Sequence, residues 1–290
     1  MKLKSFLRKA ESVLNRLDAW LPPETREPDW NAAAFRWQKA GNKGILESLP
    51  APHTFPLSRL AAVNSQTAKL VRNTEQFLAG RPANNVLLTG SRGTGKSSLV
   101  KALLYEYGAS GLRLIEVDKS DLTTLPALLQ LLASRPEKFI VFCDDLSFED
   151  GEDGYKALKT ALDGGLSQRC ANVLVYATSN RRHLMPEYMD ENTGHTGIRG
   201  EVHAKEAVEE KISLSDRFGL WLSFYPFDQN DYLQAVANWL EYYGVNFDDT
   251  AQRAALNWSQ MRGGRSGRVA WQFACDWAGR LPKDRSLNLG

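Results

Sequence analysis

Residues Gly90–Ser97 constrain the fold of this chain more than any other stretch of its sequence. They read Gly-Ser-Arg-Gly-Thr-Gly-Lys-Ser and match G-x-x-x-x-G-K-[ST] at every fixed position. An apolar run ends at Thr89, and a run of helix-forming residues follows the motif. Glycines let the backbone turn tightly, so that N–H groups at the start of a helix can surround an anion. The motif therefore predicts a strand, a phosphate loop and a helix in that order.

The side chains of this loop suit a nucleoside triphosphate with Mg²⁺. Lys96 is expected to place a positive charge on the β- and γ-phosphates, and the Ser97 hydroxyl to ligate the metal. A glycine-rich turn without a ligand is the alternative, but this pattern arises by chance in such a chain only roughly once in a hundred. The residues expected to bind the nucleotide are consecutive: Gly90, Ser91, Arg92, Gly93, Thr94, Gly95, Lys96, Ser97 and Ser98.

Two acids follow a second apolar run, Phe139–Cys143, and these are Asp144 and Asp145. A hard cation prefers oxygen ligands, so we expect Asp144 to hold Mg²⁺, directly or through a water. Asp145 is then placed to polarise the attacking water as a general base. Glu149 and Asp150 are alternative bases, or belong to a solvated turn. Taken alone, Asp144 and Asp145 fit solvated loop acids equally well; the phosphate loop upstream favours the metal site.

The hydrophobic pattern predicts an α/β fold with three parts. Apolar runs alternating with helical stretches indicate a five-stranded, mostly parallel sheet covered on both faces, within residues 55–226. Three amphipathic segments in residues 227–290 predict a helical lid, and residues 1–54 mix helical periodicity with Pro and Gly and predict an N-terminal helical extension. The expected strands are Val86–Thr89, Leu112–Val117, Phe139–Cys143, Val173–Ala177 and Leu220–Tyr225, and the lid helices Asp228–Tyr243, Asp249–Met261 and Ser266–Gly279.

Composition narrows the class of partner and the compartment. Lys and Arg number 36 against 34 Asp and Glu, a net charge of +2, which argues against a broad nucleic-acid surface but leaves room for a local basic patch. Three well-separated cysteines indicate neither a disulfide framework nor a zinc site, so we expect a cytoplasmic protein. No apolar stretch reaches the length of a transmembrane helix. Residues 1–20 fit an amphipathic helix that docks on this protein or a partner, with a membrane surface as the alternative.

These motifs, in this order, resemble the AAA+ superfamily of ATPases over about residues 55–285. More narrowly, the chain resembles a bacterial AAA+ family described as predicted ATP-binding proteins of unknown function. The stretches that carry the resemblance are Gly90–Ser98, Cys143–Phe148, Ala177–Leu184, Glu210–Gly219 and Arg262–Phe273.

The resemblance implies roles that spacing alone does not assign. Asn180 matches the sensor-1 residue, which positions the water and γ-phosphate; the alternative is an Asn in a turn. Arg217 matches the arginine finger inserted into a neighbouring subunit, which implies a ring or open-ring homo-oligomer; the alternative is an arginine paired with Asp216 or a helix end. Arg268 matches the sensor-2 arginine of the lid, with Arg265 as its competitor.

Two departures from the superfamily pattern refine the expected function. Asp145 stands where Glu is usual, so hydrolysis is expected to be slow, as in loader-type members that share the Asp-Asp pair. Val117–Leu122 has neither aromatic residue nor glycine, so threading of a peptide through a pore is not expected.

The expected function is an Mg-ATP hydrolase that remodels or loads a macromolecular partner, with ATP rather than GTP resting on the resemblance. The alternative is a nucleotide-gated adaptor or loader in DNA metabolism. In that reading Arg262, Arg265 and Arg268, with Trp271 nearby, contact phosphates of nucleic acid. The identity of the protein client is left open.

Overall fold

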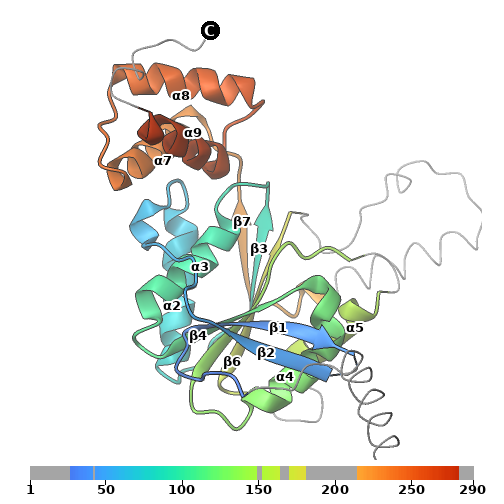
Figure 1. Ribbon diagram of the computed structural model, residues 1–290. Coiled ribbons are helices and arrows are strands. Elements are labelled where there is room, and N and C mark those ends of the chain that lie inside the picture. The colour runs from blue at the N-terminus through green and yellow to red at the C-terminus, as the bar shows by residue number, and fades with distance from the viewer. Residues whose placement is uncertain (1–26, 42, 149–151, 164–169, 181–213, 281–290) are drawn as a thin grey trace, which may run out of the picture.

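The computed structural model describes residues 27–41, 43–148, 152–163, 170–180 and 214–280. Within these residues, seven strands form one sheet in the order β2-β1-β4-β5-β6-β3-β7 (Figure 1). Neighbouring strands are parallel except β1 and β2, which are antiparallel. The strands are β1 (Ala34–Ala40), β2 (Lys43–Leu49), β3 (Val86–Gly90), β4 (Leu112–Val117), β5 (Lys138–Cys143), β6 (Val173–Ser179) and β7 (Leu220–Phe224).

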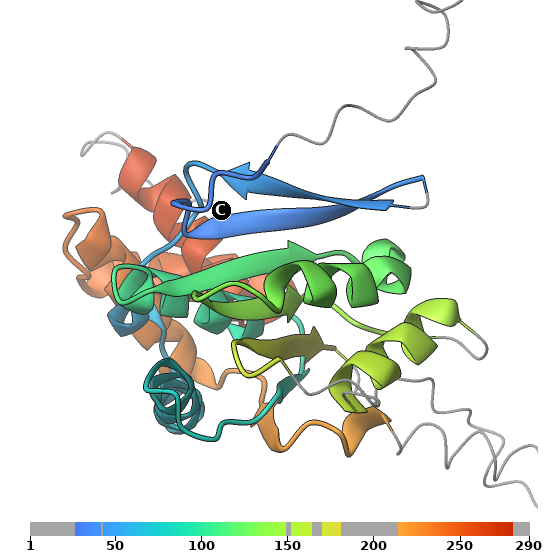
Figure 2. The ribbon, with the colours of Figure 1, turned by 90° about the horizontal axis from the view of Figure 1, so that it is seen from below.

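The five predicted strands are confirmed as β3 to β7, and helices cover both faces of the sheet they form. On one face lie α2 (Asn64–Leu78) and α3 (Lys96–Tyr107), and on the other lie α4 (Leu125–Leu132) and α5 (Asp153–Asp163) (Figure 2). Short 3-10 helices, η1 (Leu57–Arg59) and η2 (Lys119–Thr124), precede α2 and α4. Side chains on both sides of a central strand such as β5 are buried, which explains its continuous apolar run.

The predicted helical extension over residues 1–54 is wrong for residues 34–49. These residues form the hairpin β1–β2, and β1 adds to the sheet beside β4, with Phe35 opposite Ile115. Gly41 allows the tight turn, because its φ is +62°. Phe35 and Trp37 point into the core while Arg36 and Gln38 are more exposed, the alternation of a half-buried strand. The amphipathic helix predicted for residues 1–20 lies outside the described residues, as do Glu149 and Asp150.

The three predicted lid helices are confirmed as α7 (Gln229–Tyr242), α8 (Asp249–Met261) and α9 (Gly267–Gly279). Each begins after a side chain that caps the helix: Asp228, Asp248 and Ser266 accept bonds from backbone N–H groups of the first turn. The helices enclose a separate apolar core around Tyr232 and Phe273. Figure 1 places the lid beyond the carboxyl ends of β3 and β7. A ligand held at those strand ends would therefore lie beneath the lid.

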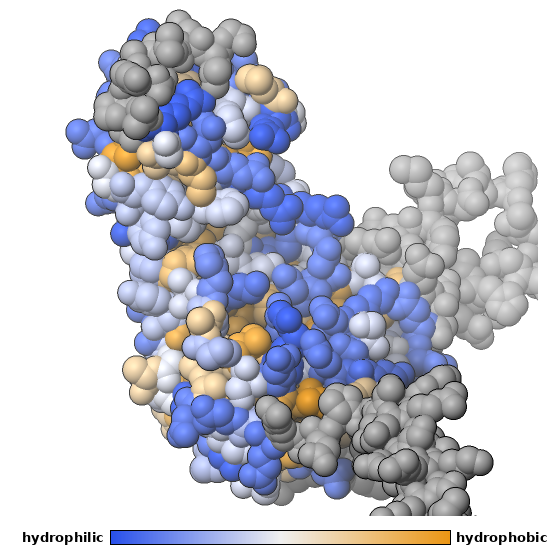
Figure 3. All heavy atoms as spheres, in the orientation of Figure 1, coloured by the Kyte–Doolittle hydropathy of each residue, from blue (hydrophilic) through white to orange (hydrophobic). Residues whose placement is uncertain are grey.

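The described surface is largely polar on the face in Figure 3, where apolar side chains are scattered over the sheet domain and lid. No helix among the described residues has the length and apolarity to cross a bilayer.

Candidate nucleotide-binding site

The phosphate loop joins β3 to α3 at the carboxyl edge of the sheet. Gly90, Gly93 and Gly95 have φ angles of +131°, +77° and +97°, which glycine adopts without steric cost. At Gly90 a Cβ atom would lie 2.0 Å from the Phe224 carbonyl oxygen of β7. The loop therefore needs glycine for its own turn and for the close approach of a neighbouring strand.

Lys96, the first residue of α3, is buried at the centre of the site with 5% of its surface exposed. Its ammonium group donates to the carbonyl oxygens of Gly90 (2.6 Å) and Ser91 (2.8 Å) and to Asn180 Oδ1 (3.0 Å). Burial lowers the pKa of Lys96, and the carboxylates of Asp144 and Asp145 oppose that shift. Because a buried ammonium favours a nearby negative charge, Lys96 is suited to contact a phosphate.

Asp144 lies directly after β5 and faces the start of α3. Its Oδ1 accepts hydrogen bonds from Ser97 Oγ (2.6 Å) and from Thr178 Oγ1 (2.5 Å). The Ser97 hydroxyl and the Asp144 carboxylate are thus adjacent oxygen ligands of the kind that Mg²⁺ prefers. Thr178 did not emerge from the sequence, although it lies two residues before Asn180 at the end of β6; only the pairing of β5 with β6 shows its position.

Asp145 occupies a left-handed backbone conformation with φ +51°, which Asp tolerates better than most residues. The backbone N–H of Asp145 donates to Thr178 Oγ1 (2.9 Å). The exposed Asp145 side chain lies near Arg92 of the phosphate loop. The carboxylate accepts a hydrogen bond from Asn180 Nδ2 and lies 3.7 Å from Arg92 Nη2. The structure therefore brings Asp145, Asn180, Arg92 and Lys96 into one cluster.

The lid touches the phosphate loop through the start of α9. The backbone N–H of Gly267 donates to the Gly93 carbonyl oxygen at 2.8 Å. A Cβ atom on Gly93 would lie 2.8 Å from Ser266 Oγ and 3.5 Å from the Cβ of Arg268. Arg268 is also close enough to Lys96 to lower the pKa of that ammonium group. The start of α9 is thus the point where lid and loop meet.

The two candidate sensor-2 arginines point to different parts of the molecule. Arg268 lies beside the loop, as its proximity to Gly93 and Lys96 shows. Arg265 instead donates from Nη2 to Gln229 Oε1 (3.1 Å) at the start of α7. Geometry therefore favours Arg268 for contact with a bound triphosphate.

Gly93→Ala is expected to weaken the contact between lid and loop. The new methyl group meets Ser266, and the left-handed backbone alone costs about 1–2 kcal/mol for a residue with a Cβ atom. Gly263→Ala is a matched control, because Gly263 has a similar φ of +71° and nothing within 4 Å of its Cβ position. We expect thermal unfolding to begin at a lower temperature in Gly93→Ala than in Gly263→Ala. Equal melting curves would contradict a lid held against the loop at Gly93.

Arg217 lies away from this cluster. Residues Leu220 and Phe224 of β7 pair with Val86 and Gly90 of β3, so Arg217 precedes the strands at their amino ends. The phosphate loop follows the carboxyl ends, roughly 16 Å further on for a strand of five residues. Arg217 Nε donates to Asp163 Oδ1 at 2.6 Å, so the arginine is paired with Asp163 at the end of α5 and not with Asp216.

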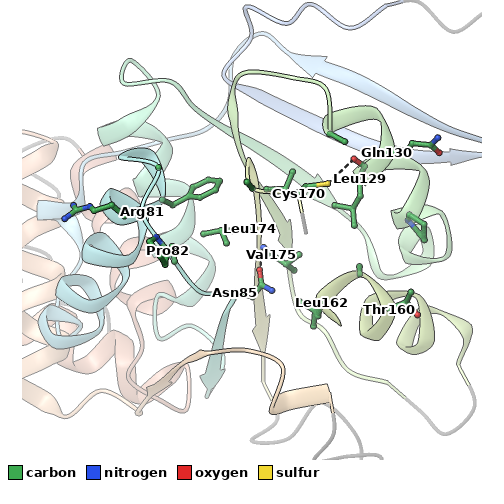
Figure 4. Close-up of a pocket in the computed structure, with 18 residues that line it drawn as sticks. Arg81, Pro82, Asn85, Leu129, Gln130, Thr160, Leu162, Cys170, Leu174 and Val175 are labelled. Carbon is green, nitrogen blue, oxygen red and sulfur yellow. Dashed lines mark hydrogen bonds between the residues drawn. The ribbon is translucent and has the colours of Figure 1, made fainter. Parts of the chain in front are cut away.

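A groove with a volume of about 840 Å³ also lies at the amino ends of the strands (Figure 4). Leu174 and Val175 of β6 form its middle, with Arg81 and Pro82 on one side and Leu129 and Leu162 on the other. It is separate from the phosphate loop, and no site residue predicted from the sequence lines it.

The residues at the loop fit a triphosphate with a divalent cation. The loop supplies N–H groups at the start of an α-helix of 12 residues, Lys96 supplies the positive charge, and Ser97 with Asp144 supplies metal-ligating oxygens. A Cβ atom at Gly93 would also occupy the approach between loop and lid.

Comparison with solved structures shows that this fold is similar to that of AAA+ ATPases. RuvB of Thermotoga maritima, a Holliday junction branch migration motor, superposes with a TM-score of 0.52 at 17% identity, over 81% of this chain and 68% of RuvB. Orc1 of Aeropyrum pernix, solved in complex with DNA, superposes with a TM-score of 0.54 at 16% identity, over 76% of this chain and 60% of Orc1. At such identities the similarity shows the fold alone. No curated protein matches the chain.

The fold is similar to that of AAA+ ATPases, and the segment between β3 and α3 has the sequence and backbone geometry of a phosphate loop. Residues 30–281 match the model of a family described as protein of unknown function (DUF815), and the chain belongs to this family. The resemblance to an AAA+ family of unknown function is thereby confirmed.

Proposed function

We propose that this protein binds Mg-ATP at the phosphate loop and hydrolyses it to remodel or load a macromolecular partner. One observation supports this above all: Lys96, Ser97, Asp144, Asp145 and Asn180 form a continuous hydrogen-bonded cluster at the loop. A glycine turn with only a structural role would not require two carboxylates and a buried lysine around it. This set matches the needs of phosphoryl transfer to water.

Each residue of the cluster has a distinct role in this proposal. Lys96 exchanges contacts with the loop carbonyls for contacts with the β- and γ-phosphates. Ser97 and Asp144 would hold Mg²⁺, which would supply positive charge to those phosphates. Asp145 accepts the proton of the attacking water, and Asn180, which already contacts both Asp145 and Lys96, holds the water between them. Arg268 reaches the phosphates from the lid.

Asp145→Asn is the variant that tests hydrolysis separately from binding. Asparagine tolerates the left-handed backbone at this position as well as aspartate does, so the loop should keep its shape. The amide is a poor proton acceptor, and we expect turnover to fall by about 10²–10⁴-fold while ATP affinity is kept. The measurement is phosphate release with Mg²⁺, beside ATP binding by titration calorimetry. Unchanged turnover would remove Asp145 as the base and leave binding untouched.

Asp144→Asn provides the comparison, because Asp144 contacts the Ser97 hydroxyl whereas Asp145 does not. We expect this variant to need more Mg²⁺ for half-maximal turnover.

A client protein, whose identity is open, should be retained best by Asp145→Asn with ATP, since that variant stays in the ATP state.

A nucleotide-gated adaptor with slow hydrolysis is the second candidate. It is favoured by the short side chain of Asp145, whose carboxylate is held by Asn180 and by Arg92 of the loop. Such a protein would be retained on single-stranded DNA in the presence of ATP, with binding that falls steeply as salt rises. Absence of binding at low salt counts against this candidate.

A further inference from the structure

Asp163 contacts Arg217, the residue that matches the arginine finger of AAA+ ATPases. Arg217 Nε donates to Asp163 Oδ1 at 2.6 Å, a short charge-assisted hydrogen bond. The Arg217 side chain is 24% exposed and the Asp163 side chain 44% exposed, so the pair lies at the surface with its arginine partly covered. A guanidinium is planar, and a carboxylate bound at Nε restricts the orientation of that plane.

Buried neighbours anchor both partners of this pair. Arg217 lies in a turn in which its own N–H and that of Phe218 donate to the carbonyls of Leu214 and Ser215. Leu214 and Phe218 pack in the same apolar core as Leu162, the residue before Asp163. Asp163 is the last residue of α5, and the carbonyl end of a helix also favours a cation. The turn and the helix end therefore hold the two side chains at a fixed separation.

We propose that Asp163 is a positioning residue that preorganises Arg217 for the ATP site of a neighbouring copy of this chain. This rests on the proposed function and on the arginine-finger role that the resemblance implies for Arg217, which would act on the site of a neighbouring copy. A free arginine side chain would lose rotamer entropy each time it entered a neighbouring site. Because Asp163 orders it beforehand, assembly costs less and the guanidinium arrives in the right plane.

The test compares variants of the whole chain that alter Asp163, Arg217 or a control pair. Asp163→Asn is expected to lower turnover on the order of 10- to 100-fold, as misplacement of a catalytic group does, with KM for ATP unchanged. The double variant Asp163→Asn/Arg217→Ala should be no slower than Arg217→Ala alone, because both changes remove one function. Asp276→Asn is the matched control: it breaks an Asp–Arg pair of comparable exposure on α9, and turnover should stay at the wild-type level.

Mixed assemblies then show that Asp163 acts with the arginine of its own chain. Asp163→Asn mixed with Lys96→Ala should regain activity, because the first chain keeps an intact phosphate loop and the second an intact Arg217. Asp163→Asn mixed with Arg217→Ala should stay slow, because neither chain presents an ordered arginine. A stable fold in each variant is checked by thermal unfolding, and Asp163→Glu, which keeps the charge, should recover part of the turnover.

Four outcomes separate this proposal from the function on which it rests. Wild-type turnover in Asp163→Asn, together with slow turnover in Arg217→Ala, would overturn the role of Asp163 alone. Recovery of turnover in the mixture of Asp163→Asn with Arg217→Ala would do the same. Wild-type turnover in Arg217→Ala would remove the arginine finger and with it the role of Asp163. Wild-type turnover in Lys96→Ala would instead refute the ATPase site.

Discussion

Lys96→Ala is expected to abolish ATP binding at any concentration used to measure turnover. The ammonium group is the only positive charge buried within the described loop, and all three of its N–H groups point to acceptors at the site. Hydrogen bonds between charged groups contribute about 1.5–3 kcal/mol each, so losing two phosphate contacts should weaken binding by at least about 100-fold. Titration calorimetry with ATP measures this directly.

A matched control distinguishes the effect of losing the Lys96 charge from the effect of damaging helix α3. Lys101 lies on the same helix α3, beyond the loop, and Lys101→Ala removes one charge without touching the described cluster. Thermal unfolding of both variants shows whether the Gly90 and Ser91 carbonyls, which lose their partner in Lys96→Ala, destabilise the fold. An ATP affinity in Lys96→Ala equal to that of Lys101→Ala contradicts the assignment of this loop.

Arg217→Ala is expected to lower turnover by about 10³–10⁵-fold while leaving ATP affinity intact. The physical reason is the separation within one chain: Arg217 lies at the amino ends of the strands and the loop at their carboxyl ends. An arginine so placed can neutralise γ-phosphate charge only in another copy, so its loss affects the transition state and not binding by its own loop. Steady-state kinetics should show a fall in kcat with little change in KM.

Arg253→Ala controls for the loss of one positive charge, since Arg253 lies on lid helix α8 away from the described site. Assembly supplies a second measurement. Specific activity of the wild-type chain should rise with protein concentration, and size-exclusion chromatography should show larger species with ATP. Turnover independent of concentration, together with a fully active Arg217→Ala, would leave the protein acting as a single copy.

The hairpin β1–β2 is the part of the fold that was predicted wrongly from the sequence. Phe35 and Trp37 are buried on either side of the more exposed Arg36, a strand pattern, but helical periodicity interrupted by Gly and Pro suggested short helices. An isolated hairpin is marginal in water, and this one is completed by pairing with β4, more than 70 residues away. A local pattern carries no information about that partner.

The same limit applied to the candidate site. Neighbours in sequence, such as Gly90 to Ser97 and Asp144 with Asp145, were predicted because a loop or strand end brings them together by itself. Thr178, Ser266 and Asp163 were missed, since each acquires its contact only when β6, α9 or α5 packs against another element. The choice between Arg265 and Arg268 as the sensor-2 candidate likewise depends on how the lid packs against the loop.

By itself, then, the sequence determined the phosphate loop, the strands β3 to β7 and the three lid helices, because hydrophobic period, glycine and capping residues act over a few residues. Tertiary structure alone decided that the sheet gains a hairpin at its edge, that Gly267 of the lid bonds to Gly93 of the loop, and that Asp163 holds Arg217. Those contacts join residues far apart in the chain, and their geometry depends on how whole elements pack.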